Sequence, residues 1–583
     1  MPNNLSPSGH WGLGFFVVSD TIANNEITIM PDFANQTLGG LDWVFIGVYF
    51  LIVAAIGYHF ARKAKDSTSY FLAGRHAGWI AVGAALFAAN ISSEHFVGLA
   101  TDGYESGFAV AQFELFAAVA CMILGWVFIP FYIRSGVFTM PEFLERRFNK
   151  QCRSYLTIVS LISYVLTKIS VTLFAGALFL NLLFGWNLYT SSLVLVIATG
   201  VYTVAGGLSA VIYTELLQAF VLIGGAVALT WIGLDKAGGL SSLIETIPIE
   251  HWSMLKPADH AKYPWPGMIF GLPILAVWYW CTDQYIVQRA LGAKNVDHAR
   301  GGALLAGFLK ILPMFLLVFP GLIAFKLFPN VSGENTKNIY PMLTTLLPAG
   351  LKGLVIAGLF AAIMSSLAAC FNSCGTLFTM DLYKPRRPQA SERELVNVGR
   401  LVTLFMVIIS ILYVPWMKAL GASSLYEYLQ KIQGYISPPI AAVFLLGVFF
   451  KRLNGRGAIS SLYVGGAIGF LRLLCEFGTN QWGWHLGPAQ NLVEMNFLHF
   501  AILMFAICVA ILVGVSLVTS SPTDEQLHGL TFATTPKDAH AVAIADSTVR
   551  GRRITLIASG CLCAIVAALW VIFYVIIPLR ISG

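Results

Sequence analysis

The sequence predicts an all-α polytopic membrane protein. Of its 583 residues, 57% are hydrophobic and only 11% are charged, whereas about a quarter of the residues in a soluble domain are charged. Apolar stretches of about 20 residues, the length that a helix needs to cross a bilayer, recur along the whole chain. Lys and Arg gather in alternate loops between these stretches, as the positive-inside rule requires of a multi-pass protein.

The apolar stretches predict about fourteen transmembrane helices. They cover residues 41–61, 77–99, 108–131, 155–184, 187–206, 212–234, 266–288, 301–328, 346–380, 398–417, 425–449, 457–475, 497–519 and 554–578. The basic loops follow the first, third, seventh, ninth and eleventh stretches and precede the last, so we expect them in the cytoplasm and both termini outside. Because these residues are spread over many loops, the net charge of +7 does not indicate a nucleic-acid partner.

The chain divides by hydropathy into five parts, without a soluble domain. They are an outside N-terminal tail (1–40), a first helix with its cytoplasmic loop (41–76), two core segments (77–234 and 266–449) and peripheral C-terminal helices (450–583). The last part includes a cytoplasmic linker at 520–552, which is too short and too poor in aromatic residues to form a core of its own.

Two of the apolar stretches are interrupted by polar residues. The second contains Asn90–Ser93, and the seventh contains Trp280–Asp283. These stretches lie five spans apart, and an odd offset makes corresponding spans run in opposite directions through the membrane. This pattern predicts an inverted repeat of five plus five helices with discontinuous first and sixth core helices, around a binding site at the midplane.

Ionisable and polar residues also occur inside the predicted spans, where each charge costs about 2.5–3.5 kcal/mol on insertion scales. They are Glu94, His95, Glu114, Lys168, Glu215, Asp283, Lys310, Gln430 and Gln433. We expect Lys168 to snorkel or to pair within the bundle, and Asp283 to pair with Arg289. Glu114, Lys310 and Gln430 have no opposite charge within a helical turn, so they indicate a shared polar cavity.

Two adjacent serines, Ser365 and Ser366, lie in the segment GLFAAIMSSLAACFNSCGT (358–376). The small residues around them allow close helix packing, which is one explanation for the pair. Adjacent hydroxyls point about 100° apart on a helix, however, so a single packing face does not need both. Na⁺ does use such groups, because it is a hard cation that takes about five or six oxygens from hydroxyls and released carbonyls. The interrupted segment Ala88–Ile91 is a source of such carbonyls.

Several segments together resemble the sodium/solute symporter family and, within it, the sodium/glucose cotransporter branch. They are YFLAGR (70–75), ALFAANISSEHFVGLA (85–100), WYWCTDQYIVQRALGAKN (278–295), AAIMSSLAACFNS (361–373), TLFTMDLYK (376–384) and PPIAAVFLLGVFFKR (438–452). The resemblance extends from about Tyr70 to Arg456. It implies a fourteen-helix protein with the five-plus-five core, embedded in the plasma membrane (the inner membrane in a bacterium), that works by alternating access.

The resemblance also implies specific ion ligands. The Na⁺ ligands that it implies are Ala88, Ile91, Ala362, Ser365 and Ser366. Glu215 stands where the family usually has an aspartate associated with cation coupling. Ala368 and Ala369 replace the hydroxyls of a second sodium site, which favours one Na⁺ per transport cycle.

The same resemblance implies a set of residues around a sugar. They are Asn90, His95, Phe113, Glu114, Tyr279, Trp280, Lys310, Gln430 and Gln433. Gln433 replaces a usual threonine, and Ala276 replaces a polar residue. These side chains suit a hexose, since Glu and Gln accept hydrogen bonds, Lys donates them, and His and Asn do both.

The predicted function is therefore Na⁺-driven import of a hexose such as glucose or galactose. The alternatives left open are another solute, such as inositol, a further polyol or a carboxylate, and a sugar-gated sensor without uptake. We do not expect an enzyme, because the sequence contains no nucleophile–base pair, metal cluster or phosphate loop at specific spacing.

Overall fold

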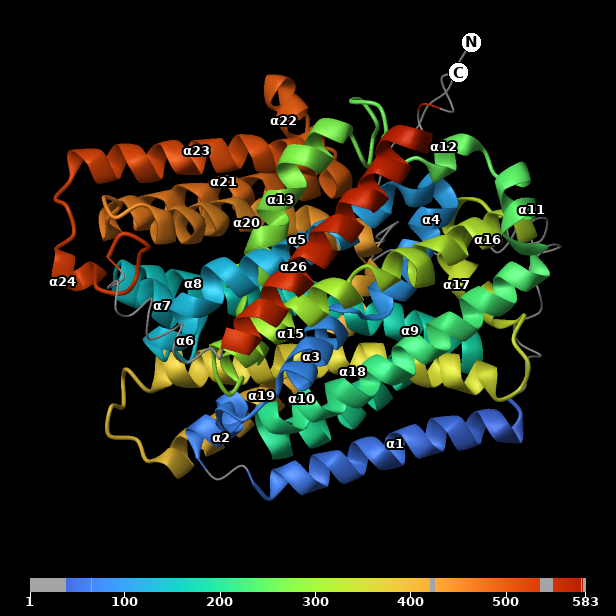
Figure 1. The fold of residues 1–583 in the computed structure, drawn as a ribbon, viewed down its shortest axis with the longest axis horizontal. Coiled ribbons are helices and arrows are strands. Elements are labelled where there is room, and N and C mark those ends of the chain that lie inside the picture. The colour runs from blue at the N-terminus through green and yellow to red at the C-terminus, as the bar shows by residue number, and fades with distance from the viewer. Residues whose placement is uncertain (1–37, 64–65, 420–424, 535–548, 578, 580–583) are drawn as a thin grey trace, which may run out of the picture.

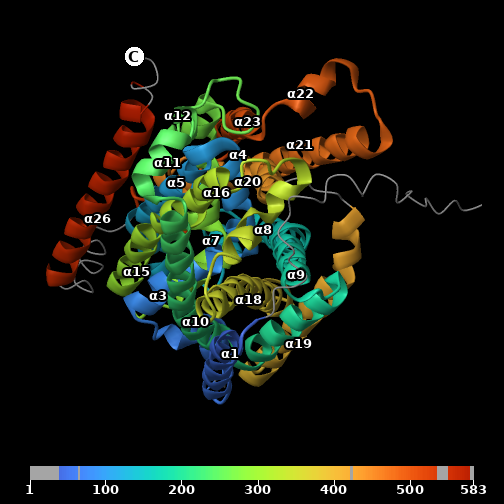
Figure 2. The same ribbon diagram turned by 90° about the vertical axis from the view of Figure 1, so that its right-hand side faces the viewer.

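The computed structural model describes residues 38–63, 66–419, 425–534, 549–577 and 579. In this part of the chain the structure is helical and contains no strand; the single isolated β-bridge joins Ala77 and Ala293. Most of the long helices run across the view in Figure 1, and several of them, such as α1 and α18, are seen nearly end-on in Figure 2, so they form one bundle. The all-α class predicted from the sequence is confirmed.

The first half of the bundle runs to the long helix α10 and the short helices after it. Its helices are α1 (Gly40–Ala61), α2 (Ser67–Leu72), α3 (Trp79–Asn90), α4 (Ala100–Ser106), α5 (Gln112–Ile123), α6 (Ile129–Ser135), α7 (Met140–Arg147), α8 (Lys150–Tyr164), α9 (Ser170–Phe184), α10 (Leu188–Lys236), α11 (Gly239–Thr246) and α12 (Ile249–Trp252). Single π-helical turns connect α5 to α6 and α8 to α9, so each pair continues as one rod.

The second half begins at a π-helical turn, Gly267–Gly271, and ends with the C-terminal helix. Its helices are α13 (Leu272–Val277), α14 (Gln284–Leu291), α15 (Val296–Leu309), α16 (Phe319–Leu327), α17 (Ile339–Thr344), α18 (Leu351–Leu377), α19 (Glu392–Ala419), α20 (Leu425–Phe449), α21 (Gly455–Trp482), α22 (Gln490–Glu494), α23 (Phe497–Val518), α24 (Asp524–Leu527) and α26 (Val549–Trp570).

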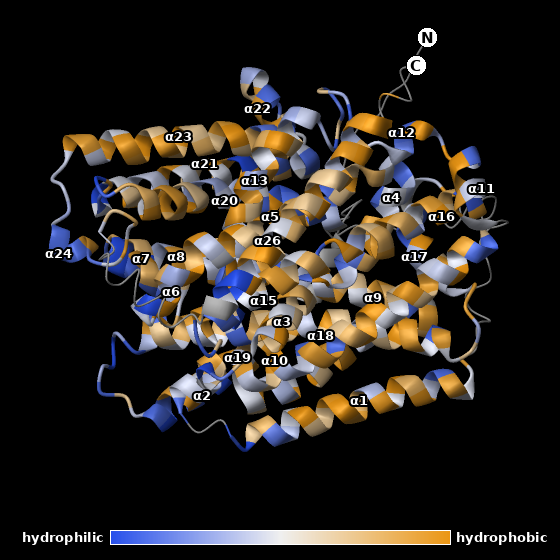
Figure 3. Cartoon of the chain, viewed as in Figure 1, coloured by the Kyte–Doolittle hydropathy of each residue, from blue (hydrophilic) through white to orange (hydrophobic). Residues whose placement is uncertain are grey.

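Within the described residues, 11 helical stretches are long and apolar enough to cross a membrane, and two shorter apolar helices occupy Trp79–Asn90 and Gly267–Thr282. The outward surfaces of α1, α23 and α26 are apolar (Figure 3), with side chains such as Leu51 and Val518 largely exposed. An apolar exterior of this extent is what a protein surrounded by lipid presents.

Helix α10 contains two apolar stretches that the sequence analysis predicts as separate spans. It contains 49 residues, about twice the length that crosses a bilayer. Gly207 interrupts it with φ 58° and ψ −153°, and a Cβ at this position would lie 2.4 Å from the Tyr70 carbonyl oxygen. Only glycine fits both the backbone angle and the space. The predicted spans 187–206 and 212–234 therefore lie on either side of Gly207.

Short polar side chains fix several helix starts. Thr139 caps α7, Asn149 caps α8, Asn187 caps α10 and Asn295 caps α15, each accepting from a backbone N–H in the first turn. Such caps satisfy donors that would otherwise lack a partner. Each of these helices therefore has a defined start at the end of an apolar span.

Helix α18 lies inside the bundle, and every residue from Val355 to Leu377 is buried. Small residues bring its neighbours close: a Cβ on Gly225 of α10 would lie 3.0 Å from the Cα of Val355. This close packing joins α18 to α10, and further along α18 the Ser365 and Ser366 hydroxyls reach the end of α3.

Candidate functional site

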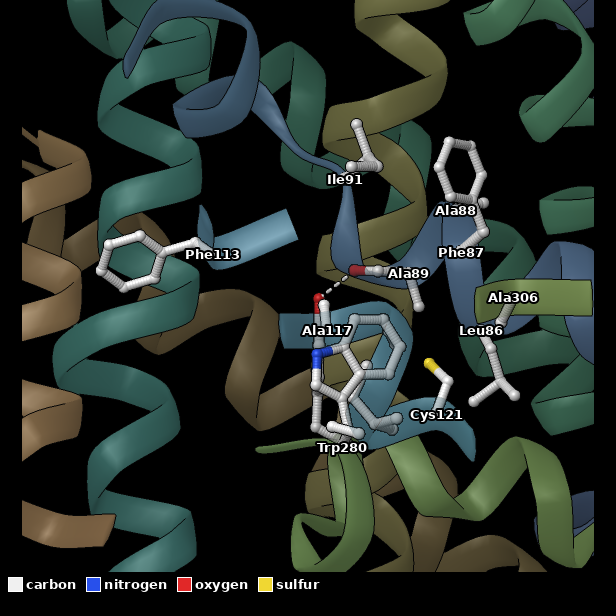
Figure 4. Packing of buried hydrophobic residues seen from close by; sticks show 14 of the residues in the cluster. Leu86, Phe87, Ala88, Ala89, Ile91, Phe113, Ala117, Cys121, Trp280 and Ala306 are labelled. Atoms are coloured by element: carbon white, nitrogen blue, oxygen red, sulfur yellow. Dashed lines mark hydrogen bonds between the residues drawn. The ribbon is translucent and has the colours of Figure 1, made fainter. Parts of the chain in front are cut away.

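The broken second apolar stretch supplies backbone carbonyls without helical partners. Helix α3 ends at Asn90, and Ile91 is extended with φ −78° and ψ 117°. The last helical bond of α3 runs from the Ile91 N–H to the Phe87 carbonyl. The carbonyls that follow are therefore available to other groups. Figure 4 shows Ala88, Ala89 and Ile91 at this break, with Trp280 nearby.

The Ser365 hydroxyl meets the end of α3. It lies 2.8 Å from the Ala88 carbonyl oxygen and 2.9 Å from the Ala362 carbonyl oxygen, and it donates to both. Ser365, Ala88 and Ala362 are all fully buried. The structure thus brings together three of the predicted ion ligands, although 277 residues separate Ala88 from Ser365.

The Ser366 hydroxyl meets the same break one residue further on. It donates to the Ala89 carbonyl at 2.9 Å and, more weakly, to the Ile91 carbonyl at 3.4 Å. The Ala89 carbonyl also accepts from the Tyr285 hydroxyl. All five predicted ion ligands therefore gather at one point between α3 and α18. Ala89 and Tyr285 belong to the same cluster and were not predicted.

A buried polar cavity lies beside this cluster. Every residue predicted for the sugar site lines it: Asn90, His95, Phe113, Glu114, Tyr279, Trp280, Lys310, Gln430 and Gln433. Ala276 also lines the cavity. The breaks after Asn90 and at Asp283 both adjoin the cavity, as expected for paired discontinuous helices.

Lys310 is the centre of a polar chain across the cavity. Its ammonium forms an ion pair with Glu114 and donates to the Asn90 side-chain oxygen at 2.5 Å. The Asn90 amide in turn donates to the Tyr279 hydroxyl at 2.9 Å. Glu114 and Lys310 lack an opposite charge on their own helices but neutralise each other between α5 and α15. Both side chains are at most 2% exposed.

Aromatic rings cover one side of the cavity. The Tyr426 ring lies 5.6 Å from the His95 ring and 5.8 Å from the Phe113 ring, both at steep angles. Tyr426 was not predicted as a site residue. The available signal was its position one helical turn before Gln430, which places the two side chains on one face.

Comparison with known proteins identifies the family. The model of the sodium:solute symporter family matches residues 70–465. The chain belongs to the sodium:solute symporter family.

The symporter is similar over most of its length to characterised relatives. It is 42% identical to sodium/glucose cotransporter 4 of Mus musculus, covering 89% of this chain and 81% of that protein. It is 41% identical to sodium/glucose cotransporter 1 of Oryctolagus cuniculus (84% and 81%) and 42% identical to the sodium/myo-inositol cotransporter of Homo sapiens (84% and 75%).

Its fold is also similar to that of a solved symporter. A substrate-bound, outward-open Na⁺-coupled sialic acid symporter aligns with a TM-score of 0.72 at 22% identity, covering 83% of this chain and 99% of that one. The chain is thus a multi-pass membrane transporter rather than an enzyme, and Na⁺ is the ion it carries with its solute.

The predicted pairing of Asp283 with Arg289 is wrong. Asp283 forms an ion pair with Lys168 and accepts from the Tyr164 hydroxyl, while Arg289 pairs with Glu215 at 2.8 Å. Asp283 is extended and precedes α14, whereas Arg289 lies in the last turn of this helix. They therefore meet different neighbours.

Lys262 ties the loop before α13 to α4. It lies 3.2 Å from Asp102 and 2.8 Å from Glu105. Burial lowers the pKa of Lys262, but the two carboxylates outweigh this effect and hold the pKa above its ordinary value. The lysine therefore stays charged at neutral pH, and the contact adjoins Tyr263, whose ring lies 6.3 Å from Phe113.

Further residues line the cavity that the sequence did not assign to it. They are Glu94, Lys168, Thr172, Leu272, Leu275, Tyr285, Tyr426 and Leu429, together with Ala117. The sequence marked Glu94 and Lys168 as ionisable residues within spans, but gave no reason to place them beside the sugar residues.

Proposed function

We propose that this symporter imports a sugar or a related polyol, driven by one Na⁺ bound where the Ser365 and Ser366 hydroxyls meet the broken end of α3. The observation that carries the proposal is this contact, directly beside a polar cavity. The relatives named as sodium/glucose cotransporters support a hexose as the solute.

The chemistry of the oxygen cluster suits Na⁺. The carbonyls of Ala88, Ile91 and Ala362 and the two serine hydroxyls would supply five neutral oxygens, within the five or six that a hard cation of this size takes. The carbonyl dipoles stabilise the ion without a permanent buried charge. The cluster can therefore form and separate once per cycle.

The chemistry of the cavity suits a hydroxylated ring. Glu114 and Gln430 would accept hydroxyl protons, Lys310 would donate, and Asn90, His95 and Gln433 can do both. Phe113 and Trp280 would cover the apolar face of the sugar. A solute without these hydroxyls would leave buried polar groups unsatisfied, which makes such a site selective.

Coupling between ion and sugar follows from the shared broken helix. Asn90 belongs to the sugar site, and its neighbours Ala88 and Ile91 belong to the ion site. Na⁺ binding would hold α3 against α18 and so fix the position of Asn90. Each ligand then favours the bound state of the other, as thermodynamic coupling requires. Displacement of Tyr279, which Asn90 holds, would open the route to the cytoplasm.

The available driving force is sufficient for accumulation. One charge that crosses about 100 mV releases about 2.3 kcal/mol. A tenfold Na⁺ gradient adds about 1.4 kcal/mol. The total of about 3.7 kcal/mol sustains roughly a 500-fold sugar gradient with one Na⁺.

The architecture that accompanies this function has fourteen spans. The 11 long stretches, the two shorter apolar helices and the division of α10 at Gly207 are consistent with this number. The inverted repeats would cover 77–234 and 266–449. Both termini would lie outside the plasma membrane, with the cytoplasmic linker at 520–552; residues 1–37 and 535–548 lie outside the described residues.

The test is labelled sugar uptake into proteoliposomes with and without a Na⁺ gradient. The double variant Ser365→Ala, Ser366→Ala should lose the Na⁺ dependence of uptake while the protein still folds. Ser391→Ala is the control: this exposed hydroxyl accepts from the Glu394 N–H at the start of α19, away from the cluster, and its loss should leave the Na⁺ dependence of uptake unchanged. Unchanged Na⁺ activation in the double variant would refute the ion site.

A polyol is the second candidate solute, because the sodium/myo-inositol cotransporters are as similar to this chain as the sodium/glucose cotransporters. Competition of unlabelled glucose, galactose and myo-inositol against each labelled compound decides between them. Glu114→Ala should weaken binding of the true solute far more than binding of Na⁺. Uptake that survived this change would mean that the cavity is not the solute site.

A further inference from the structure

A groove of about 460 Å³ lies between the first turns of α15 and α26, beside the start of α3. Figure 2 shows α26 at the edge of the bundle, next to α15. The groove faces outward, because Trp79 and Ile554 on its walls are 44% and 57% exposed. Each of the two helices lines it with one face, through Gly301, Leu304 and Phe308 of α15 and through Gly551, Ile554 and Ala558 of α26.

The groove results from the way in which α15 and α26 pack. Further along both helices the contact is tight: a Cβ on Gly307 would lie 2.8 Å from the Leu562 side chain, and Leu562 belongs to a buried apolar cluster with Leu304. Nearer the two helix starts, Gly301 and Gly551 have no side chains to fill the space between the helices. The two helices therefore enclose a space that is closed at its deep end and open toward the helix starts.

Hydrogen-bond donors gather at the open end of the groove, at the start of α15. His298 lines the groove, and its Nδ1 atom accepts from the Trp79 N–H at 3.1 Å. The proton of the neutral ring is therefore on Nε2, which is a donor. Asn295 also lines the groove, and its Oδ1 atom accepts from the His298 N–H at 3.0 Å. The side-chain amide of Asn295 is then a second donor.

Basic residues surround the same end. Arg552 is exposed in the first turns of α26, directly after a groove residue. Arg552 and Arg134 lie close enough to Arg300 of α15 to repel its charge. The acidic residue among those that line the groove, Asp297, lies 4.0 Å from Arg300. Several like charges with one carboxylate among them favour the binding of an anion at this end.

We propose that this groove binds one anionic phospholipid, with its phosphate between Arg552, His298 and Asn295 and an acyl chain between α15 and α26. The basic loops before both helices are predicted to be cytoplasmic, and basic pockets between transmembrane helices on this side suit such head groups. This binding site goes beyond the proposed transport function and does not depend on which solute is carried.

The length of the groove favours a lipid over a partner helix. The groove residues of α26 extend from Gly551 to Ala558, a rise of about 10 Å. A transmembrane partner helix would follow α26 through the whole hydrocarbon thickness of about 30 Å, whereas the acyl chain of one leaflet covers about half of it. The groove ends within one leaflet, as the site of a single lipid does.

The test is lipid binding to the purified, delipidated protein in detergent, followed by native mass spectrometry. The two probes are phosphatidylglycerol and phosphatidylcholine with the same acyl chains. We expect the wild type to retain one phosphatidylglycerol per chain, bound at least about fivefold more tightly than phosphatidylcholine. Equal retention of the two lipids would overturn the anionic site.

Arg552→Gln tests the contact with the head group. It should weaken phosphatidylglycerol binding about fivefold and leave phosphatidylcholine binding unchanged. Arg456→Gln is the matched control, because Arg456 is also exposed in the first turn of a helix, α21, that follows a basic loop. Its lipid binding should equal that of the wild type. Phosphatidylglycerol binding by Arg552→Gln at the strength of the wild type would contradict the proposal.

Ala558→Phe tests the place of the acyl chain by filling the groove. It should lower the binding of both lipids, whereas Ile557→Phe, at an adjacent residue that is 58% exposed, should not. Thermal unfolding without added lipid shows whether each variant is folded, and the Arg552→Gln comparison decides alone if Ala558→Phe is not. Undiminished lipid binding by folded Ala558→Phe would mean that the groove is not the site. Because these measurements use neither Na⁺ nor sugar, their failure would leave the proposed transport function standing.

Discussion

The ion pair between Glu215 and Arg289 gives a quantitative prediction for stability. The two groups form a fork, with Arg289 Nη2 2.8 Å from Glu215 Oε1 and Nε 3.3 Å from Oε2. Both side chains are 0% exposed. Glu215→Gln removes one charge and leaves the guanidinium buried without its partner. Loss of one member of a buried pair costs about 3–5 kcal/mol of unfolding free energy.

The same loss converts to a measurable change in melting temperature. With an unfolding entropy of about 2.1 cal/mol/K per residue, the whole chain has about 1.2 kcal/mol/K. A cost of about 3–5 kcal/mol therefore lowers Tm by about 2.5–4 °C. The double variant Glu215→Leu, Arg289→Met removes both charges and should recover most of this loss, because apolar residues replace a buried pair at little cost.

The assay is thermal unfolding of the purified protein in detergent, followed by intrinsic fluorescence or by size-exclusion chromatography after heating. Arg146→Gln is the control, because it breaks a surface pair with Glu142 in which Arg146 is 44% exposed. Such a pair contributes about 0–1 kcal/mol, so its Tm should hardly change. If Glu215→Gln melts like the wild type, or if the double variant is no more stable than the single one, the buried pair does not stabilise the fold as argued.

Three other predictions follow from single contacts. Tyr279→Phe removes the hydroxyl that accepts from Asn90 at 2.9 Å. Losing about 1 kcal/mol of sugar-binding free energy should raise the sugar concentration for half-maximal uptake about fivefold. Tyr435→Phe is the control and should not change it, because the Tyr435 hydroxyl bonds Glu476 outside the cavity. Gly207→Ala places a methyl group 2.4 Å from the Tyr70 carbonyl oxygen at a φ of 58° and should lower the free energy of unfolding by more than about 2 kcal/mol. The measurement is a lower yield of folded protein. Gly224→Ala, which has open space around it, is the control and should be neutral. Lys310→Met leaves Glu114 buried without its cation, so it should destabilise the fold and abolish sugar binding. Adding Glu114→Gln should restore folding but not uptake. Recovery of uptake in this double variant would contradict the role of the pair in the site.

The order of the spans and the position of both breaks could be predicted from the sequence. Length and hydropathy are local properties, and a helix must break where polar residues interrupt a span that has no water to satisfy the backbone. The helix ends at Asn90 and the extended residue at Asp283 lie inside the predicted interruptions. The predicted spans 187–206 and 212–234 were separated at the position where Gly207 interrupts α10.

The contact between Ala88 and Ser365 could not be predicted from local properties. The pattern showed a source of carbonyls and a source of hydroxyls, and only the family resemblance joined them. The prediction of the charge pair between Asp283 and Arg289 failed for the same reason. Asp283 was assigned to Arg289 because they are close in sequence, yet the true partners, Lys168 and Glu215, belong to other helices. Sequence distance says little about spatial distance where helices run antiparallel through a membrane.

In the described part of the chain, three ion pairs between a carboxylate and a lysine or arginine are buried on both sides, and they share one property that bears on how this transporter moves. Each joins a residue of the first predicted repeat to a residue of the second: Glu114 to Lys310, Lys168 to Asp283 and Glu215 to Arg289. Separating such a pair inside the membrane costs several kcal/mol, so the helices that it joins are expected to stay together during transport. The hydrogen bonds described between α3 and α18 join hydroxyls to carbonyls, which separate at a cost of about 1 kcal/mol per hydrogen bond. The contact between α3 and α18 therefore needs less free energy to separate than the three ion pairs do. The proposed Na⁺ binds at this contact, so its binding and release act on the place where movement is easiest.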